Sequence, residues 1–158
     1  MKKVLIVCMG NICRSPMAQV VMQKAIALQG LQTEFKVESA GTHAQKGERL
    51  DPRAQAALLR RGFAPDRHQA RRVSSPDFES FDLLLAMDNA NLAELKKHCP
   101  PQHQHKLHLF LEFGVVSAGT QATAEVPDPY YGNVQGFDKV LDLCTATTAA
   151  FLKHHAPG

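Results

Sequence analysis

The stretch KKVLIVCMGNICRSPMAQVV, residues 2–21, decides the fold. Lys2 to Val7 form a continuous aliphatic run, which is typical of a strand buried on both faces of a parallel sheet. The next residues show no periodicity. Ser15 and Pro16 then predict a helix, with Ser15 as its N-cap and Pro16 as its first helical residue. The stretch therefore predicts a strand, a tight loop and a helix, in that order.

The alternation of strands and helices continues along the chain. The first helix is expected to end at Gly30. Further strands are expected at residues 34–38, 81–87 and 106–110, and further helices at residues 51–61, 89–98 and 136–154. This order predicts an α/β fold of three layers, Rossmann-like, in which a four-stranded parallel sheet is flanked by helices on both faces. Ligands of such sheets bind beyond the carboxyl ends of the strands.

Length and composition indicate one ordinary globular domain, residues 1–158. The chain is 44% hydrophobic and 21% charged, and its longest strongly apolar runs are about five residues, whereas a bilayer span needs roughly 20. We therefore expect no membrane association. The net charge of +3 is too small to indicate a nucleic-acid partner. The arginines lack stacking aromatics and are more typical of a solvated face; they are Arg60, Arg61, Arg67, Arg71 and Arg72.

The cysteines and histidines do not form the usual patterns of a disulfide scaffold or a metal site. Four cysteines in 158 residues, without a repeated C-x-x-C pair, favour a reducing compartment, and the apolar run after the N-terminal lysines is too short for a signal peptide. We therefore expect a cytoplasmic protein. The run of histidines between His98 and His108 lacks paired ligand spacing, so neither a metal nor another cofactor is expected.

The loop from Cys8 to Ser15 carries the chemistry. A helix N-terminus with inward-pointing amides binds anions, and Gly10 and Asn11 tolerate the positive φ that a tight curl requires. The same field favours the ionised form of the Cys8 thiol, which is then a nucleophile at neutral pH. Arg14 supplies a planar guanidinium that can hold two phosphoryl oxygens at once. The loop therefore predicts a phosphate site with a nucleophilic sulfur.

Five segments resemble the low-molecular-weight protein tyrosine phosphatases. They are VCMGNICRSP at 7–16, SAGT at 39–42, HQAR at 68–71, MD at 87–88 and DPYYG at 128–132. They extend over nearly the whole chain in the order that the family has. The resemblance implies the fold of that family. It also implies hydrolysis of protein phosphotyrosine and small aryl phosphates through a cysteinyl-phosphate.

The resemblance assigns the catalytic roles. Cys8 is the expected nucleophile, Arg14 the phosphate clamp, and Asp128 the general acid, which later acts as the base toward water. A positioned acid typically contributes 10² to 10⁴-fold to the rate. The other expected residues of the phosphate-binding loop are Met9, Gly10, Asn11, Ile12, Cys13 and Ser15.

The resemblance assigns supporting roles as well, each with an ordinary structural alternative. Ser15 is expected to stabilise the thiolate, although it could simply cap a helix. Ser39 and His68 are expected to hold the loop in shape, although serines at strand ends and histidines in loops are common without a function. Tyr130 and Tyr131 are expected to form one wall of the substrate cleft, or else an aromatic packing corner.

Three details remain open at this stage. Residues 43–46 read HAQK, where the family often has an aromatic residue, so we expect a weaker grip on aryl substrates or a role for His43. Cys13 is either a second thiol that captures oxidised Cys8 as a disulfide or a buried inert residue. Asp88 either belongs to the site or only caps the helix that follows it.

Other functions fit less well. Thiol-dependent arsenate reductases have two further redox cysteines near the end of the third strand, but residues 82–98 contain none and only Cys99 lies close. Protein-arginine phosphatases usually have threonine at the position of Ile12. A silent phosphate-binding module would not need Asp128. The expected partners are therefore proteins that contain phosphotyrosine, and the expected state is a monomer or a weak dimer.

Overall fold

The computed structural model describes residues 1–65, 67–114, 125–130 and 132–156. Four strands form one parallel sheet in the order β2-β1-β3-β4, which confirms the predicted α/β fold. The elements of the described residues are β1 (Lys2–Cys8), α1 (Arg14–Leu28), β2 (Phe35–Gly41), α2 (Pro52–Arg60), α3 (Ser75–Ser80), β3 (Leu83–Ala86), α4 (Asn89–His98), the 3₁₀ helix η1 (Pro101–Lys106), β4 (Leu107–Leu109), the 3₁₀ helix η2 (Phe110–Phe113) and α5 (Val134–His155).

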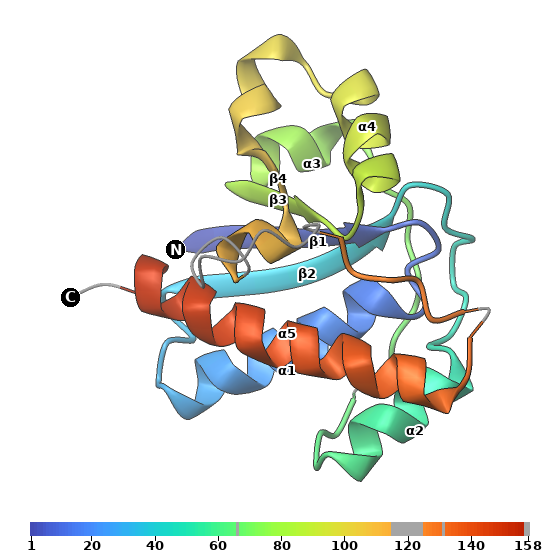
Figure 1. Cartoon of the computed structure of the whole chain (residues 1–158). Coiled ribbons are helices and arrows are strands. Elements are labelled where there is room, and N and C mark those ends of the chain that lie inside the picture. The colour runs from blue at the N-terminus through green and yellow to red at the C-terminus, as the bar shows by residue number, and fades with distance from the viewer. Residues whose placement is uncertain (66, 115–124, 131, 157–158) are drawn as a thin grey trace.

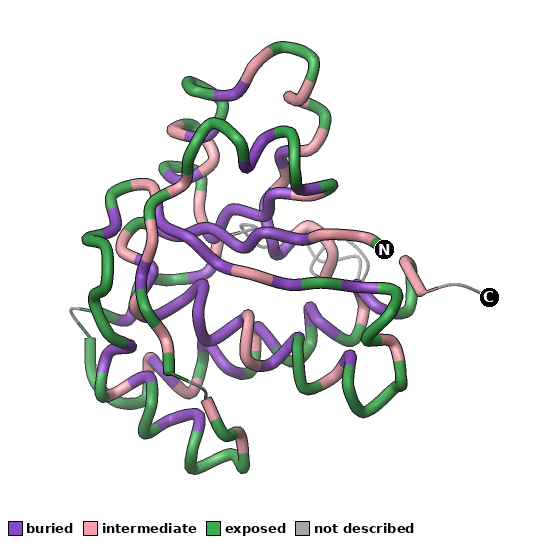
Figure 2. The backbone as a smooth tube through the Cα atoms, turned by 180° about the vertical axis from the view of Figure 1, so that it is seen from behind, coloured by how far each residue is buried: buried purple, intermediate pink, exposed green. Residues whose placement is uncertain are grey.

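Helices cover both faces of the sheet (Figure 1). In β1, Val4 and Ile6 belong to the core with α1, α2 and α5, whereas Leu5 and Val7 belong to the core with α3 and α4. All four side chains are 0% exposed, and the tube through β1 is almost continuously buried in Figure 2. Because successive side chains of a strand point to opposite faces, an unbroken aliphatic run is what a central strand between two helical layers needs.

The strand order places a switch point at the carboxyl end of β1. From β1 the chain continues to β2 on one side, and β3 later pairs on the other side. Cys8 is the last residue of β1, opposite Gly41 of β2. Asp88 follows the end of β3, where the amide of Met87 donates to the carbonyl of Val7 at 2.9 Å. These strand ends therefore meet at one edge, where doubly wound sheets bind ligands.

The start of α1 differs from the prediction. The helix begins at Arg14 with Cys13 as its N-cap, and Ser15 is not the cap. The amide of Met17 donates to the Cys13 carbonyl at 3.0 Å, so the first helical turn closes directly after the loop. The hydroxyl of Ser15 is thereby free to turn toward the loop instead of capping the backbone.

Two other elements depart from the expected pattern. β2 runs on to Gly41 because Ser39, Ala40 and Gly41 stay paired with the end of β1. The short helix α3 was not predicted, since six residues are too few to show a helical period. It begins with a capping box between Ser74 and Asp77.

The arginine cluster is not a simple solvated face. Arg61 donates to Oδ1 of Asp142 at 2.6 Å, and Arg60 lies 3.4 Å from Oδ2 of Asp138. These pairs join the end of α2 to α5. Arg71 forms two hydrogen bonds with Asp77, as described below. At least these three arginines therefore contribute to tertiary contacts.

Candidate active site

Residues 8–15, which we call the phosphate loop, curl between β1 and α1. Asn11 has a φ of 56°, a conformation that asparagine tolerates better than most residues. Gly10, which would also tolerate a positive φ, does not adopt one. The curl brings the amide of Asn11 to 3.2 Å from Sγ of Cys8, to which it donates. The loop thus folds back over its own cysteine.

The side chain and carbonyl of Asn11 are fully hydrogen-bonded. Its Nδ2 donates to Oγ of Ser15 at 2.9 Å and to Oγ of Ser39 at 3.0 Å. Its Oδ1 accepts from the amide of Arg71 at 3.1 Å, and its carbonyl lies 2.6 Å from Nε2 of His68. Asn11 is 0% exposed, so every one of these bonds replaces water. Two distant parts of the chain, Ser39 and the segment from His68 to Arg71, therefore hold the strained point of the loop.

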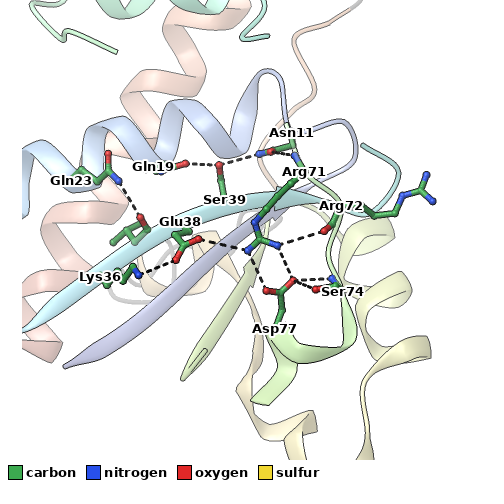
Figure 3. A network of polar contacts seen from close by, with 11 residues as sticks. Asn11, Gln19, Gln23, Lys36, Glu38, Ser39, Arg71, Arg72, Ser74 and Asp77 are labelled. Atoms are coloured by element: carbon green, nitrogen blue, oxygen red, sulfur yellow. Dashed lines mark hydrogen bonds and ion pairs between the residues drawn. The ribbon is translucent and has the colours of Figure 1, made fainter. Parts of the chain in front are cut away.

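A second group of polar contacts supports this arrangement from outside (Figure 3). Oγ of Ser39 donates to Oε1 of Gln19 at 2.5 Å. Arg71 donates from Nη1 and Nη2 to the two carboxylate oxygens of the buried Asp77, at 3.0 and 3.2 Å, and lies 3.8 Å from Glu38. This network fixes the segment whose amide reaches Asn11.

The sulfur of Cys8 is buried and receives polar contacts. Cys8 is 3% exposed, and its Sγ lies 2.9 Å from Oγ of Ser15. Ser15 accepts from Asn11, and its own O–H can donate to the sulfur at 2.9 Å or to the Ala40 carbonyl at 3.4 Å, of which the sulfur is the nearer. The amide of Asn11 adds a second donor. Donors of this kind stabilise a thiolate.

Gly41 allows the loop to pack closely against β2. An added Cβ at this position would lie 2.5 Å from the carbonyl oxygen of Met9. The amides of Thr42 and His43 donate to the carbonyls of Cys8 and Met9, both at 2.9 Å. A side chain at position 41 would push these strands of backbone apart, so the glycine is required by close approach.

Arg14 reaches into the same site from the first turn of α1. It is 3% exposed, and its Nη1 donates to Oδ2 of Asp88 at 2.7 Å and to the carbonyl of Val126 at 3.0 Å. Nη2 lies 3.7 Å from Oδ2 of Asp128. Asp88 also caps α4, because its Oδ1 accepts from the amide of Asn91 at 2.8 Å. Asp88 therefore caps α4 and also contacts Arg14.

These groups surround a pocket of about 320 Å³. Its lining residues are Cys8, Met9, Gly10, Ile12, Cys13, Arg14, His43, Gln45, Glu48, Asp128 and Tyr130. Asp128 is the exposed acid at the mouth, and its Oδ1 accepts from the amide of Tyr130 at 3.0 Å. Tyr131, the other expected wall residue, lies outside the described residues. His43 lines the pocket from residues 43–46, the segment in which the family often has an aromatic residue.

Burial sets the charge of two neighbouring groups. Burial raises the pKa of the Cys13 thiol, and the nearby Asp51 carboxylate raises it further, so Cys13 is a neutral thiol. Burial lowers the pKa of His68, and the hydrogen bond with the Asn11 carbonyl offsets this only in part. At neutral pH His68 is therefore uncharged, with its proton on Nε2 so that it can donate to Asn11.

Among the described residues, no group of three or more His, Cys, Asp or Glu side chains could hold a metal ion. Likewise, none of the helices in that part of the chain has the length and hydrophobicity needed to cross a membrane.

Residues 3–156 match the family described as low molecular weight phosphotyrosine protein phosphatase. The protein of that name from Schizosaccharomyces pombe is 40% identical over 153 residues, which cover 96% of this chain and 95% of the relative. The chain belongs to this family. Because its members are cysteine-based phosphatases, the chain is a phosphatase enzyme.

Solved structures agree with this assignment. A protein tyrosine phosphatase from Entamoeba histolytica superimposes on this chain with a TM-score of 0.89 at 38% identity, and the match covers 97% of this chain and 96% of the other. The arginine phosphatase YwlE gives a TM-score of 0.85 at 25% identity, covering 96% and 94% of the two chains. The latter structure is a cysteine-to-serine mutant with a phosphorylated active-site serine.

The phosphatase also contains site residues that sequence reasoning missed. Gln19 and Asp77 support the loop, and Asp51 and Arg53 lie between the loop and the segment that carries Asp128. Only Asp51 gave a signal in the sequence, as the residue before Pro52 at the start of a helix. The others make contacts across long separations, which no local pattern reports.

Proposed function

We propose that this phosphatase hydrolyses protein phosphotyrosine and small aryl phosphates through a phosphocysteine at Cys8. The observation that carries the proposal is that Cys8, Arg14 and Asp128 line one pocket. A nucleophile, a cation and an acid around one cavity are the groups that transfer of a phosphoryl group requires.

In the first step the thiolate of Cys8 attacks phosphorus. An S–P bond forms as the bond between phosphorus and the aryl oxygen breaks. Asp128, in its protonated form, gives its proton to that oxygen, so that a neutral phenol leaves. The guanidinium of Arg14 and the loop amides stabilise the negative charge on the phosphoryl oxygens. Asp88 and Val126 keep the Arg14 side chain directed into the pocket.

In the second step water attacks the phosphocysteine. Asp128 is now a carboxylate and takes a proton from the water as the new P–O bond forms. The S–P bond breaks and its electrons return to Cys8 as a thiolate. The hydroxyl of Ser15, 2.9 Å away, stabilises this leaving sulfur. Inorganic phosphate then leaves, and the proton that Asp128 took from the water leaves it ready to act as the acid in the next cycle.

The substrate class is supported by the relatives and by the pocket wall. Relatives named as phosphotyrosine phosphatases are 40% and 37% identical, whereas the arginine phosphatase is 25% identical. Tyr130 supplies an aromatic face at the pocket. We further propose that residues 1–158 act as one domain, as a monomer or a weak dimer, without nucleic-acid partners. A reducing compartment such as the cytoplasm suits its four free cysteines.

The test is to trap the intermediate. The enzyme is mixed with an aryl phosphate in the presence of a chelator, quenched in acid, and mapped by tandem mass spectrometry. Phosphorus is expected on Cys8, and Cys8→Ser is expected to abolish turnover. Asp128→Asn is expected to slow turnover by about 10² to 10⁴-fold when the leaving group is poor. Cys99→Ser, outside the pocket, serves as the matched thiol control. Turnover that survives Cys8→Ser would refute the proposal.

A further inference from the structure

The start of α2 is attached to the phosphate loop. The amide of Asp51 donates to the carbonyl of Ile12 at 2.9 Å. The carboxylate of Asp51 caps α2, because Oδ1 accepts from the amide of Arg53 at 2.8 Å. Asp51 is only 7% exposed. The first turn of α2 is therefore fixed relative to the loop that surrounds Cys8.

Arg53 is held by this same carboxylate. Its Nε and Nη2 donate to Oδ1 and Oδ2 of Asp51, at 3.2 and 2.9 Å. Burial alone would raise the pKa of Asp51, but the hydrogen bonds from Arg53 outweigh it and the pKa is lowered. The pair is thus a two-pronged ion pair, which restricts the orientation of the guanidinium.

The free end of the guanidinium reaches the segment that carries Asp128. Nη1 of Arg53 donates to the carbonyl of Tyr130 at 2.9 Å. The guanidinium carbon also lies 5.3 Å from the ring centroid of Tyr130 and 4.8 Å from that of Phe137 in α5. Both distances are within the range of cation–π attraction. The amide of Tyr130 in turn donates to Asp128.

These contacts form a continuous connection from the phosphate loop to Asp128. We propose that Arg53 is a positioning residue that holds Asp128 at the height of the leaving-group oxygen. The inference rests on the proposed role of Asp128 as the general acid. Asp128 is exposed. The amide of Tyr130 donates to it at 3.0 Å, closer than the 3.7 Å between its carboxylate and Arg14, so the placement of Asp128 depends on how residue 130 is held. An acid displaced by about 1 Å can lose 10²-fold in rate.

The experiment compares Arg53→Met, Arg53→Lys and the control Arg61→Met. Lysine keeps a positive charge beside the buried Asp51 but loses the planar fork, so this variant remains informative if Arg53→Met does not fold. Arg61 also joins α2 to α5, through Asp142, but contacts neither Asp128 nor Tyr130 in the described contacts. Each variant is assayed on phenyl phosphate and on 2,4-dinitrophenyl phosphate, in the wild-type and Asp128→Asn backgrounds.

We expect Arg53→Met to lower kcat/KM on phenyl phosphate by about 10 to 10²-fold, because kcat/KM reports the first step, in which Asp128 acts as the acid. On 2,4-dinitrophenyl phosphate, whose leaving group needs no proton, the loss is expected to be about 2-fold, and Arg53→Lys should lie in between. Inhibition by inorganic phosphate should change by less than about 2-fold, because the phosphate loop is intact. In the Asp128→Asn background, Arg53→Met should have almost no further effect. Arg61→Met should behave as wild type.

Two results separate the possible failures. If Asp128→Asn alone shows no dependence on the leaving group, the proposed function of Asp128 is wrong, whatever Arg53 does. If Asp128→Asn behaves as expected but the Arg53 variants slow both substrates equally, or slow Asp128→Asn as much as wild type, Arg53 has only a structural role. Full activity of both Arg53 variants would also overturn the inference.

Discussion

The phosphate loop and the acid loop, residues 125–130, meet in one pocket but are held in different ways. In the phosphate loop Asn11 is fully buried, and residues from two other segments, Ser39 and residues 68–71, satisfy its polar groups. In the acid loop the side chain of Asp128 is 37% exposed and lies 3.7 Å from Arg14. A site for phosphate must be rigid before the ligand arrives, whereas an acid at the mouth must admit a bulky leaving group. The two loops reflect these two requirements.

The largest effect expected from this comparison concerns Arg14. Arg14→Lys keeps the charge but cannot hold two phosphoryl oxygens, so kcat/KM should fall by about 10³-fold. The loss should be the same for a good and a poor leaving group, whereas the loss in Asp128→Asn should grow as the leaving group becomes poorer. Steady-state kinetics with a series of aryl phosphates measures both. If the loss in Arg14→Lys also depended on the leaving group, the phosphate loop would affect protonation of the leaving group as well as binding of the phosphoryl group.

A smaller effect is expected from the strained residue of the phosphate loop. Asn11→Ala removes the side-chain hydrogen bonds and leaves a non-glycine residue at positive φ, so kcat/KM should fall by about 10²-fold. Its free energy of unfolding should fall by about 1 to 3 kcal/mol. Asn11→Gly, which relieves the strain but makes no side-chain bonds, is the control. If the two variants are equally stable, the positive φ costs nothing.

A third prediction separates the two roles of Asp88. Asparagine caps helices as well as aspartate, so Asp88→Asn should change the free energy of unfolding by less than about 0.5 kcal/mol. It weakens the bond to Arg14, and kcat/KM should fall by about 10-fold. Asp88→Ala should lose both the cap and the activity. Urea unfolding combined with kinetics tests this, and an unchanged activity in Asp88→Asn would show that Val126 alone orients Arg14.

The smallest effect concerns pH and His68. Because its pKa is lowered in the folded state, the unfolded chain takes up this proton more readily. The contribution of neutral His68 to the free energy of unfolding is complete above the unfolded pKa of about 6.5 and is lost as the pH falls below that value. His68→Gln can still donate to the Asn11 carbonyl but does not titrate. Urea unfolding at pH 8 and pH 5.5 should show a larger loss of stability in wild type than in His68→Gln; equal losses would contradict the assignment.

The parts of the fold that depend on local sequence could be predicted. The strand at the N-terminus, the alternation of the four strands with α1, α2, α4 and α5, and the bounds of α4 follow from runs, periods and capping residues. The predicted start of α1 was wrong because the Ser15 hydroxyl faces the sulfur of Cys8 instead of the helix backbone. The bonds from His68 and Arg71 to Asn11, and from Arg53 to Tyr130, join residues at least 57 positions apart. No local rule reports such contacts.

The long reach of these bonds has a consequence for refolding. Arg14 is fixed in part by Val126, which lies 112 positions along the chain, and Asn11 by Arg71, 60 positions away. Closing such large loops is entropically slow compared with forming helices. During refolding, the far-ultraviolet dichroism signal should therefore return before phosphate turnover does. The rate at which turnover recovers then reports how fast the last segments dock, so enzyme activity can be used to follow the final step of folding.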